Sequence, residues 1–439
     1  MNFGIDGSLN KIYIKRRTFE QWLVMLILFF PFAFGLLFET LALPEFIKYL
    51  IDLSVVVLAV GFIMKKRIII KRNVMPAVMV ILIFFVYTLV VYVFNFQSPF
   101  YYLWGLRNNF RFYVAFFAFT VYIDESFANS LLKIFDVLFW ANIIISVVQF
   151  VLFGVLQDQL GGLFGSSGAT NAYTLIFFTI IISKSLLQTF NGYEKVSLCV
   201  FKCVASLLVA AMAEMKFYFF VFIILLGLAS VLTKFSRRKF VILLLSGVAV
   251  AVGAMILTYL FEEFKGFLTI TGIIEAATQE HYATQTDIGR LNAIFTLAQN
   301  YITNPIQQIF GMGLGNCDLS EVEIFNSKFY QQYSYLHYTW FSSAITFLEN
   351  GFIGMAIYLS FFVVCLKNAA SQLKRKVGNK LFCQLAVMVS LMCFVLFFYN
   401  STLRIEAAYM PYFVLALPFL ENNTTENKTL SYKSSAQTV

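Results

Sequence analysis

Residues 74–95 of this chain read VMPAVMVILIFFVYTLVVYVFN, an apolar run without a single charged side chain. Runs of roughly 17 to 25 apolar residues can cross a hydrocarbon layer of about 30 Å as helices, because a helix satisfies its own backbone hydrogen bonds there. The run lacks the regular apolar and polar alternation that is typical of a barrel strand. It therefore predicts a transmembrane helix, and it sets the fold class for the chain.

The composition of the whole chain is that of a polytopic membrane protein. Its 439 residues are 60% hydrophobic and only 13% charged, and the mean hydropathy of +0.79 lies outside the range of soluble globular domains. Apolar runs predict about twelve spans, near residues 20–38, 46–64, 74–95, 108–123, 134–154, 172–188, 196–213, 216–233, 240–261, 339–366, 381–400 and 406–420. The expected fold is an all-α polytopic membrane protein.

The expected organisation divides the chain at one large outer loop. Residues 1–261 hold the first nine predicted spans with short outer loops, and residues 262–338 form the large loop. Residues 339–420 hold the last three spans, and residues 421–439 form a polar tail that we expect to be disordered and cytoplasmic.

The positive charge of the chain indicates its topology. Basic clusters at residues 15–17, 65–67, 237–239 and 374–376 fall on alternate connections, so the positive-inside rule predicts that both termini are cytoplasmic. This explains the net charge of +9 without a nucleic-acid partner. We expect a multi-pass protein of the bacterial inner (plasma) membrane, whose first apolar segment is retained as an anchor. Of six cysteines only Cys317 lies in an outer loop, so neither a disulfide framework nor a thiolate metal cluster is predicted.

Cations on the outer side need an explanation other than topology. Arg107 and Arg111 stand four residues apart at the mouth of a predicted span, so they share one helix face. Two guanidiniums together suit phosphate binding, with interfacial snorkelling as the alternative. Lys216 lies in the very short turn between two spans, where a charge is costly unless it is paired or hydrated. Its alternative is an ion pair with Glu214.

The large outer loop contains a predicted amphipathic helix and a glycine run. Apolar residues recur at helical spacing at Ile288, Leu291, Ile294, Phe295, Ala298, Tyr301 and Ile302. The pattern predicts a helix that lies on the membrane or roofs a cavity, with Arg290 at the edge of its apolar face. The run Gly311-Met312-Gly313-Leu314-Gly315 either exposes amides to an anion or forms a tight return loop.

Further polar residues stand at the membrane boundary. His337 lies among tyrosines where the loop re-enters the membrane, so it is either an aromatic-belt residue or a base for a hydroxyl nucleophile. His281 is expected to be a plain loop residue. A glycine-rich outer loop, residues 161–171, either binds sugar hydroxyls or forms a re-entrant turn. Two ion pairs are predicted from spacing, Lys48 with Asp52 and Arg404 with Glu406.

In this order the motifs resemble the family of bacterial O-antigen polymerases and O-antigen ligases, which are membrane glycosyltransferases that act on sugars linked to undecaprenyl diphosphate. The resemblance covers most of the chain. It rests on Gly162-Leu163-Phe164-Gly165 with Asn171, on Lys216, on Arg290 followed by Asn304-Pro305 and the glycine run, and on Leu348-Glu349-Asn350-Gly351-Phe352-Ile353-Gly354.

Two departures from the family pattern favour a polymerase over a ligase. Ligases usually carry a His-Asn pair at a spacing that here falls on Trp340, whereas His337 lies three residues earlier. Lys216 stands where an arginine is common.

The resemblance implies a GT-C-like fold and an inverting transfer of the growing glycan from undecaprenyl diphosphate to a sugar hydroxyl of the next lipid-linked repeat unit. It implies neither a metal nor another cofactor, and its partners are undecaprenyl-diphosphate-linked oligosaccharides, membrane lipids, and a flippase and chain-length regulator of the same pathway. An O-antigen ligase acting on lipid A core and a lipid-linked oligosaccharide flippase or other transporter stay open as alternatives.

Each site residue has an expected role under this resemblance. Arg290 and Lys216 stabilise the diphosphate, and Arg107 and Arg111 steer the second head group. His337 is the base, with Glu349 as the fallback. The residues expected to contact the glycan or shape its loop are Asn171, Gly313 and Gly315.

Overall fold

The computed structural model describes residues 18–64, 72–167, 170–261, 269, 271–272, 279, 286–320 and 322–420. All regular elements in these ranges are helical, which confirms the all-α prediction. Most of the first part of the predicted outer loop, including His281, and the tail from residue 421 onward lie outside the described residues.

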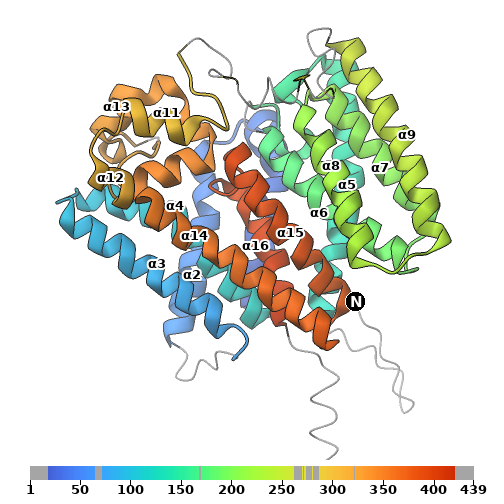
Figure 1. Cartoon of the computed structure of the whole chain (residues 1–439), viewed down its shortest axis with the longest axis horizontal. Helices are drawn as coiled ribbons and strands as arrows, with labels where there is room; N and C mark the ends of the chain where they lie inside the picture. The colour runs from blue at the N-terminus through green and yellow to red at the C-terminus, as the bar shows by residue number, and fades with distance from the viewer. Residues whose placement is uncertain are drawn as a thin grey trace, which may run out of the picture.

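The described residues form fifteen α-helices, arranged as Figure 1 shows. They are α1 (Phe19–Phe29), α2 (Tyr49–Met64), α3 (Met75–Phe94), α4 (Pro99–Tyr122), α5 (Glu125–Phe153), α6 (Thr170–Phe190), α7 (Val196–Met212), α8 (Lys216–Leu232), α9 (Arg237–Leu260), α11 (Ala293–Asn300), α12 (Pro305–Phe310), α13 (Lys328–Tyr333), α14 (Ser342–Arg375), α15 (Lys380–Tyr399) and α16 (Tyr409–Ala416). Short 3-10 and π turns join several of them.

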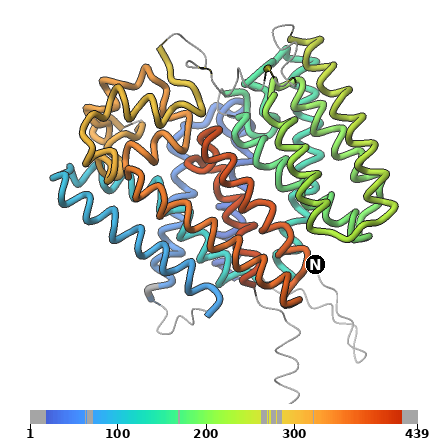
Figure 2. Tube along the Cα trace, viewed as in Figure 1, coloured from blue at the N-terminus to red at the C-terminus, as the bar shows by residue number. Residues whose placement is uncertain are grey.

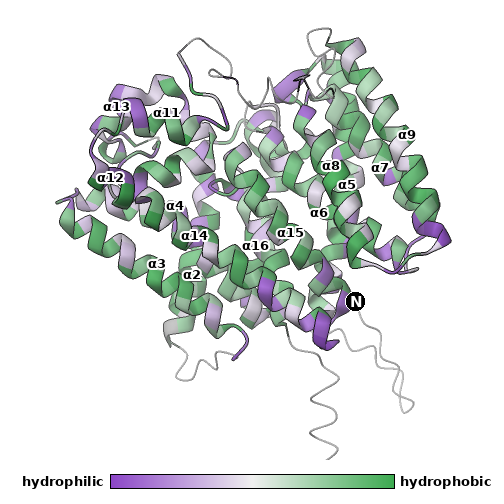
Figure 3. Cartoon of the chain, in the orientation of Figure 1, coloured by the Kyte–Doolittle hydropathy of each residue, from purple (hydrophilic) through white to green (hydrophobic). Residues whose placement is uncertain are grey.

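Six of the described helices are long and apolar enough to cross a membrane: α3, α5, α6, α9, α14 and α15. Three shorter apolar segments are Phe19–Ala33, α7 and α8. Figure 3 shows apolar residues along the sides of the helices and polar residues gathered at their ends. The chain is therefore a helical membrane protein, while the number of twelve spans stays a prediction.

The helices form two groups joined by a central layer (Figures 1 and 2). One group contains α5 to α9, in which α7 packs against α9 and α6 packs against α8. The other contains α2, α3 and α4, with α11, α12 and α13 above them at one end. The central helices α14, α15 and α16 contact both groups, and α14 packs along α15. Aromatic side chains fill much of these contacts, as where Phe361 of α14 meets Phe116 of α4 and Phe413 of α16 meets Phe135 of α5.

Helix α14 is broken about one third of the way along its length, and the glycine run of the outer loop binds at this break. Gly351 has φ 60° and ψ −170°, which ends the regular hydrogen bonding of the first half of the helix. The carbonyls of Leu348 and Glu349 instead accept from the amides of Met312 and Gly313, both at 2.9 Å. The break therefore supplies acceptors that dock the glycine run on the membrane-spanning core.

Candidate functional site

The two arginines of α4 meet one carboxylate of α2. The Nε atom of Arg107 donates to Asp52 at 3.0 Å, and Arg111 lies 3.2 Å from the other oxygen of Asp52. Their predicted common face is confirmed. They lie inside the helix, however, because α4 already begins at Pro99 and not near residue 108.

The predicted pairing of Lys48 with Asp52 is wrong. Lys48 bonds Glu45 at 2.6 Å within a 3-10 turn that precedes α2. The two residues therefore do not share one continuous α-helix, and Asp52 forms ion pairs with the two arginines of α4 instead.

The predicted pairing of Arg404 with Glu406 is also wrong. Arg404 binds Glu349 at 3.0 Å and Asp318 at 2.7 Å, whereas Glu406 binds Arg111 at 2.9 Å. The reason is tertiary, since an arginine from the distant helix α4 supplies the counter-charge of Glu406. The hydroxyl of Tyr173 donates to the other oxygen of Glu406 at 2.8 Å.

These contacts form two ionic clusters, one of Asp52, Arg107, Arg111 and Glu406 and one of Asp318, Glu349 and Arg404. A hydrogen bond from Arg111 to the carbonyl of Arg404 at 3.3 Å joins the two clusters into one network. Buried ions are expensive unless their remaining hydrogen bonds are made. Here Asn108 donates to Asp318 at 2.6 Å, and Asn109 accepts from Arg404 at 3.1 Å. The network joins α2, α4, the outer loop, α14 and the segment before α16, so its first role is to hold these elements together.

Glu349 and the glycine run act as one structural unit. Glu349 is fully buried, and one of its oxygens accepts from the Gly315 amide at 2.8 Å. Gly311, Gly313 and Gly315 all have positive φ, and a Cβ atom on Gly315 would overlap the carbonyl of Tyr101. The arrangement found is thus the tight return loop, in which the amides of Met312, Gly313 and Gly315 bind α14 and not an anion. The predicted glycan contacts of Gly313 and Gly315 stay predictions.

A second cluster gathers at the C-terminal end of α15. The guanidinium of Arg290 lies 4.2 Å from the ring centre of Tyr399. The ring of Phe217 stacks on the same tyrosine at 3.7 Å and 10°. Two groups this close to the ring centre cannot share a face, so Tyr399 separates Arg290 from the beginning of α8. Lys216 is the residue before Phe217, so it lies on the α8 side of this stack.

The other members of this cluster come from α6 and the turn before α8. The side-chain amide of Asn171 donates to the carbonyl of Ala213 at 3.3 Å. Lys216 lies 3.7 Å from Glu214, so the alternative of an ion pair is found, although the lysine side chain remains 38% exposed. Asn171 and Lys216 therefore both lie at the turn that joins α7 to α8.

His337 is tied to the segment that carries Arg290. The amide of Ile288 donates to the carbonyl of Leu336 at 3.3 Å, which joins the two ends of the described outer loop. The imidazole stacks on Trp340 at 4.1 Å and 13°, and the backbone of His337 is left-handed with φ 52°. Among the described residues, its buried Nδ1 atom has no hydrogen-bond partner. The Nδ1 atom therefore keeps one hydrogen-bonding position that the described residues do not fill.

The amphipathic helix of the outer loop is shorter than predicted. It spans α11, Ala293–Asn300, after a turn at residues 290–292. Its buried face carries Ala293 and Leu297. Leu291 and Phe295, which were predicted to lie on the apolar face, are exposed. The helix begins late, so the phase set by Ile288 and Leu291 does not continue into it.

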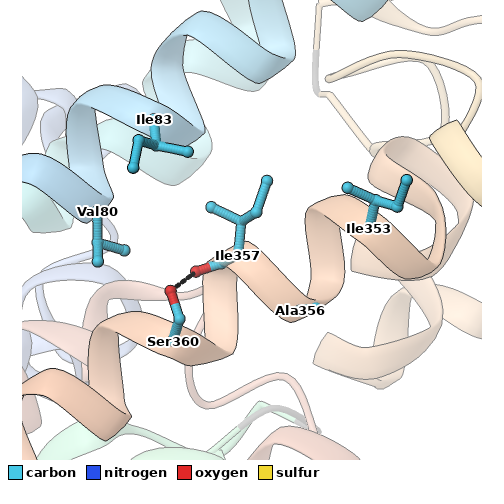
Figure 4. Close-up of a pocket in the computed structure, with 6 residues that line it drawn as sticks. All are labelled: Val80, Ile83, Ile353, Ala356, Ile357 and Ser360. Atoms are coloured by element: carbon cyan, nitrogen blue, oxygen red, sulfur yellow. Dashed lines mark hydrogen bonds between the residues drawn. The ribbon is translucent and has the colours of Figure 1, made fainter.

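An apolar groove lies apart from the cations (Figure 4). It runs between α3 and α14 and is lined by Val80, Ile83, Ile353, Ala356, Ile357 and Ser360. The hydroxyl of Ser360 donates to the carbonyl of Ile357 at 2.6 Å, so the one polar lining side chain is satisfied within its own helix. The groove offers a hydrocarbon surface without charge.

Three residues of these sites escaped sequence reasoning. Asp318 carries no local signal, because its partners come from α4 and from the segment before α16. Phe217 and Tyr399 belong to aromatic-rich span ends, where an interfacial belt is the usual explanation. Only the fold shows that their rings stack.

Comparison with the sequence models of protein families and with curated proteins finds no match for this chain. The functional assignment therefore rests on the residues and their geometry.

Proposed function

We propose that this protein is a membrane glycosyltransferase of the polysaccharide polymerase type, acting in the synthesis of an O-antigen, capsule or exopolysaccharide. It would transfer a growing glycan from undecaprenyl diphosphate to a sugar hydroxyl of the next lipid-linked repeat unit, with inversion. The observation that carries this proposal is the stack on Tyr399, in which Arg290 of the outer loop lies on the same aromatic ring as Phe217, the residue after Lys216.

The two cations, Arg290 and Lys216, suit the diphosphate leaving group of this reaction. A diphosphate that departs from the anomeric carbon gains negative charge in the transition state, and preorganised cations lower the barrier most. Arg290 provides a planar fork for two phosphate oxygens, and Lys216 provides a compact charge. Because the donor is already activated, the reaction needs neither a nucleotide nor a metal.

His337 is the proposed base for the attacking sugar hydroxyl. Its Nδ1 atom is free of hydrogen bonds within the described residues, and its segment is bonded to that of Arg290. Glu349 is the weaker candidate, because it is buried and paired with Arg404. It would have to leave that arginine before it could accept a proton from a hydroxyl.

The ionic network limits which of its arginines could bind a substrate. Arg111 is buried between Asp52 and Glu406, so contact with a second lipid head group would require it to leave both. Arg107 is 25% exposed in its side chain and remains the better candidate for that contact. Asn171 stays the proposed contact for a sugar hydroxyl, for which its side-chain amide would have to leave Asp158 or the carbonyl of Ala213. The site would lie on the outer side of the bacterial inner membrane, with both termini cytoplasmic.

The test is a polymerisation assay with the purified full-length protein in liposomes. Incubation with lipid-linked repeat units alone should give a ladder of longer products. Arg290→Ala and Lys216→Ala should each reduce the rate at least tenfold, while Lys328→Ala, an exposed cation of the same outer loop, serves as the matched control. Full activity of both variants would remove the diphosphate assignment.

Other products of the same assay would replace the proposed function. Transfer that occurs only after addition of lipid A core would identify a ligase. Movement of labelled lipid-linked units between the leaflets without any ladder would identify a flippase.

A further inference from the structure

The turn between α3 and α4 exposes an unusual set of aromatic side chains. Phe94 is 78% exposed and Phe96 is 95% exposed, and Phe100 at the start of α4 is also exposed. No charged residue occurs between Arg72 and Arg107. Three of the four residues between α3 and α4 are polar, so the exposed apolar surface comes from the phenylalanine rings. Exposed apolar side chains that gather in one place are typical of a surface that contacts a partner or a membrane.

The backbone at Phe96 points the aromatic ring outward. Its φ of 46° lies in the left-handed region, which is uncommon for a bulky residue and costs of order 1–3 kcal/mol. Such a conformation persists only where the surrounding structure enforces it. The fold therefore maintains an exposed aromatic ring at the tip of this turn in spite of a local cost.

Two side-chain amides and three backbone amides of the same turn donate hydrogen bonds within the protein. The side-chain amide of Asn95 donates to the carbonyl of Gly311 at 3.2 Å, and that of Gln97 donates to the carbonyl of Leu314. The backbone amides of Asn95, Phe96 and Gln97 bond the last turn of α3 at 3.0 to 3.3 Å. Internal satisfaction of donors is what an apolar solvent demands of a lipid-exposed turn.

Helix α12 continues this surface. Ile306 is 66% exposed, and Phe310 at the end of the helix is also exposed. The hydroxyl of Tyr87 on α3 donates to the carbonyl of Phe310 at 3.0 Å, which holds α12 beside the outer end of α3 (Figure 1). The surface formed by Phe94, Phe96, Phe100, Ile306 and Phe310 is here called the apolar rim.

The apolar rim is continuous with the lipid-facing side of a membrane-spanning helix. Val90 and Val93, on the last turns of α3, are both exposed, and α3 is a candidate span. Its 20 residues extend about 30 Å, the thickness of the hydrocarbon layer. The end of α3 at Phe94 then falls at the boundary between hydrocarbon and head groups, where aromatic side chains are enriched.

We propose that the apolar rim inserts into the outer leaflet of the bilayer, so that lipid chains and not water cover the α3–α4 turn and α12. Insertion would dock the base of the outer loop on the membrane as well as on α14. The proposal does not depend on the proposed enzymatic function. The surface favours lipid over a second copy of this chain because it continues the lipid-facing side of α3 and carries no charge to select a protein partner.

Spin labelling of the full-length protein in liposomes tests the proposal. Phe96→Cys and Ile306→Cys carry the nitroxide at the apolar rim, Val90→Cys is the lipid-facing reference, and Gln332→Cys on exposed α13 is the aqueous reference. The native cysteines are all buried, so the unmutated protein gives the background. Collision rates with oxygen, which concentrates in lipid, and with a water-soluble nickel chelate are compared.

Both rim labels should resemble Val90→Cys, with high collision rates with oxygen and at least fivefold lower collision rates with nickel than Gln332→Cys. Nickel accessibility equal to that of Gln332→Cys would overturn the proposal, because the rim would then be in water. Shielding from both reagents together with spin–spin broadening would overturn it in favour of an interface between two copies. If Phe96→Cys does not fold, Phe94→Cys replaces it under the same criteria.

Discussion

Glu349 of α14 binds Arg404 at 3.0 Å while its other oxygen accepts from the amide of Gly315 at 2.8 Å. One carboxylate therefore joins the broken helix, the glycine run and the segment before α16. Because the carboxylate is fully buried, neither bond competes with water. The pair explains why an acidic residue stands in a membrane-spanning helix without requiring that it take part in catalysis.

Loss of Glu349 should destabilise the fold. Glu349→Ala leaves Arg404 buried with Asp318 as its remaining carboxylate, and removing one partner of a buried pair typically costs about 3–5 kcal/mol. Glu349→Gln should lose less, since the amide oxygen can still accept from Gly315. The unfolding temperatures in detergent measure the difference, and Glu323→Gln, at an exposed position, is the control. An unfolding temperature for Glu349→Ala equal to that of the control would contradict the role of the network.

Gly315 should not tolerate a side chain, because a Cβ atom would collide with α4. Gly154, which also has positive φ, serves as the control without such a collision. Gly315→Ala forces a Cβ atom onto the carbonyl of Tyr101, whereas a Cβ atom on Gly154, which also has positive φ, would meet no other atom within 4 Å. Gly154→Ala should therefore cost only about 1 kcal/mol from backbone strain. Gly315→Ala should lower the folded yield severely. Similar unfolding temperatures for the two variants would show that the close approach to α4 is not tight.

Tyr399 should matter for the proposed reaction through its ring. The ring lies between Phe217 and Arg290, and a cation on an aromatic face is stabilised by about 0.5–2 kcal/mol. Tyr399→Ala should raise the KM for the lipid-linked donor severalfold, whereas Tyr399→Phe should stay near the wild type. Steady-state rates at several donor concentrations separate KM from kcat. Equal KM values for all three proteins would show that the stack does not position Arg290.

Cys317 should be unreactive in the native protein despite its place in the outer loop. The residue is fully buried, and burial raises the pKa of its thiol well above the ordinary value, so little thiolate is present near neutral pH. A water-soluble maleimide should modify it only after unfolding, while Lys328→Cys, at an exposed position, should react within minutes. Rapid modification of native Cys317 would mean that the outer loop opens.

A second buried ionic cluster should stabilise α5, α6 and α7. Asp136 binds both Lys184 and Lys202, and Lys202 also lies 3.3 Å from Glu194. Lys202→Ala should cost a few kcal/mol, because it leaves Glu194 and part of Asp136 without a counter-charge. The unfolding temperature of this variant is compared with that of Lys195→Ala, which changes an exposed lysine directly before α7. Equal stability of the two variants would place this cluster in contact with water.

The helical membrane class and the candidate residues follow from local sequence. Apolar runs such as residues 74–95 require helices whatever their neighbours are, because the backbone has no other partner in hydrocarbon. The common face of Arg107 and Arg111 depends only on the helical repeat, and the structure confirms it. The glycine run likewise predicted a tight turn of the backbone.

Pairing between distant segments could not be predicted in this way. Spacing suggested Lys48 with Asp52 and Arg404 with Glu406, yet both carboxylates bind arginines from another element. Short-range periodicity says which residues share a face but not which face of another helix they meet. The same limit hid the stack of Arg290, Tyr399 and Phe217.

The sequence by itself determined that this protein is helical and membrane-embedded, and it determined which few cations, glycines and histidine stand out from an apolar chain. Only the tertiary structure decided that Glu349 binds the glycine run at the break in α14, and that Arg290 and Phe217 both contact the ring of Tyr399 at the end of α15. The physical reason is the range of the forces. Transfer of backbone into lipid acts on each segment alone, whereas ion pairs and ring stacks require two segments to have found each other.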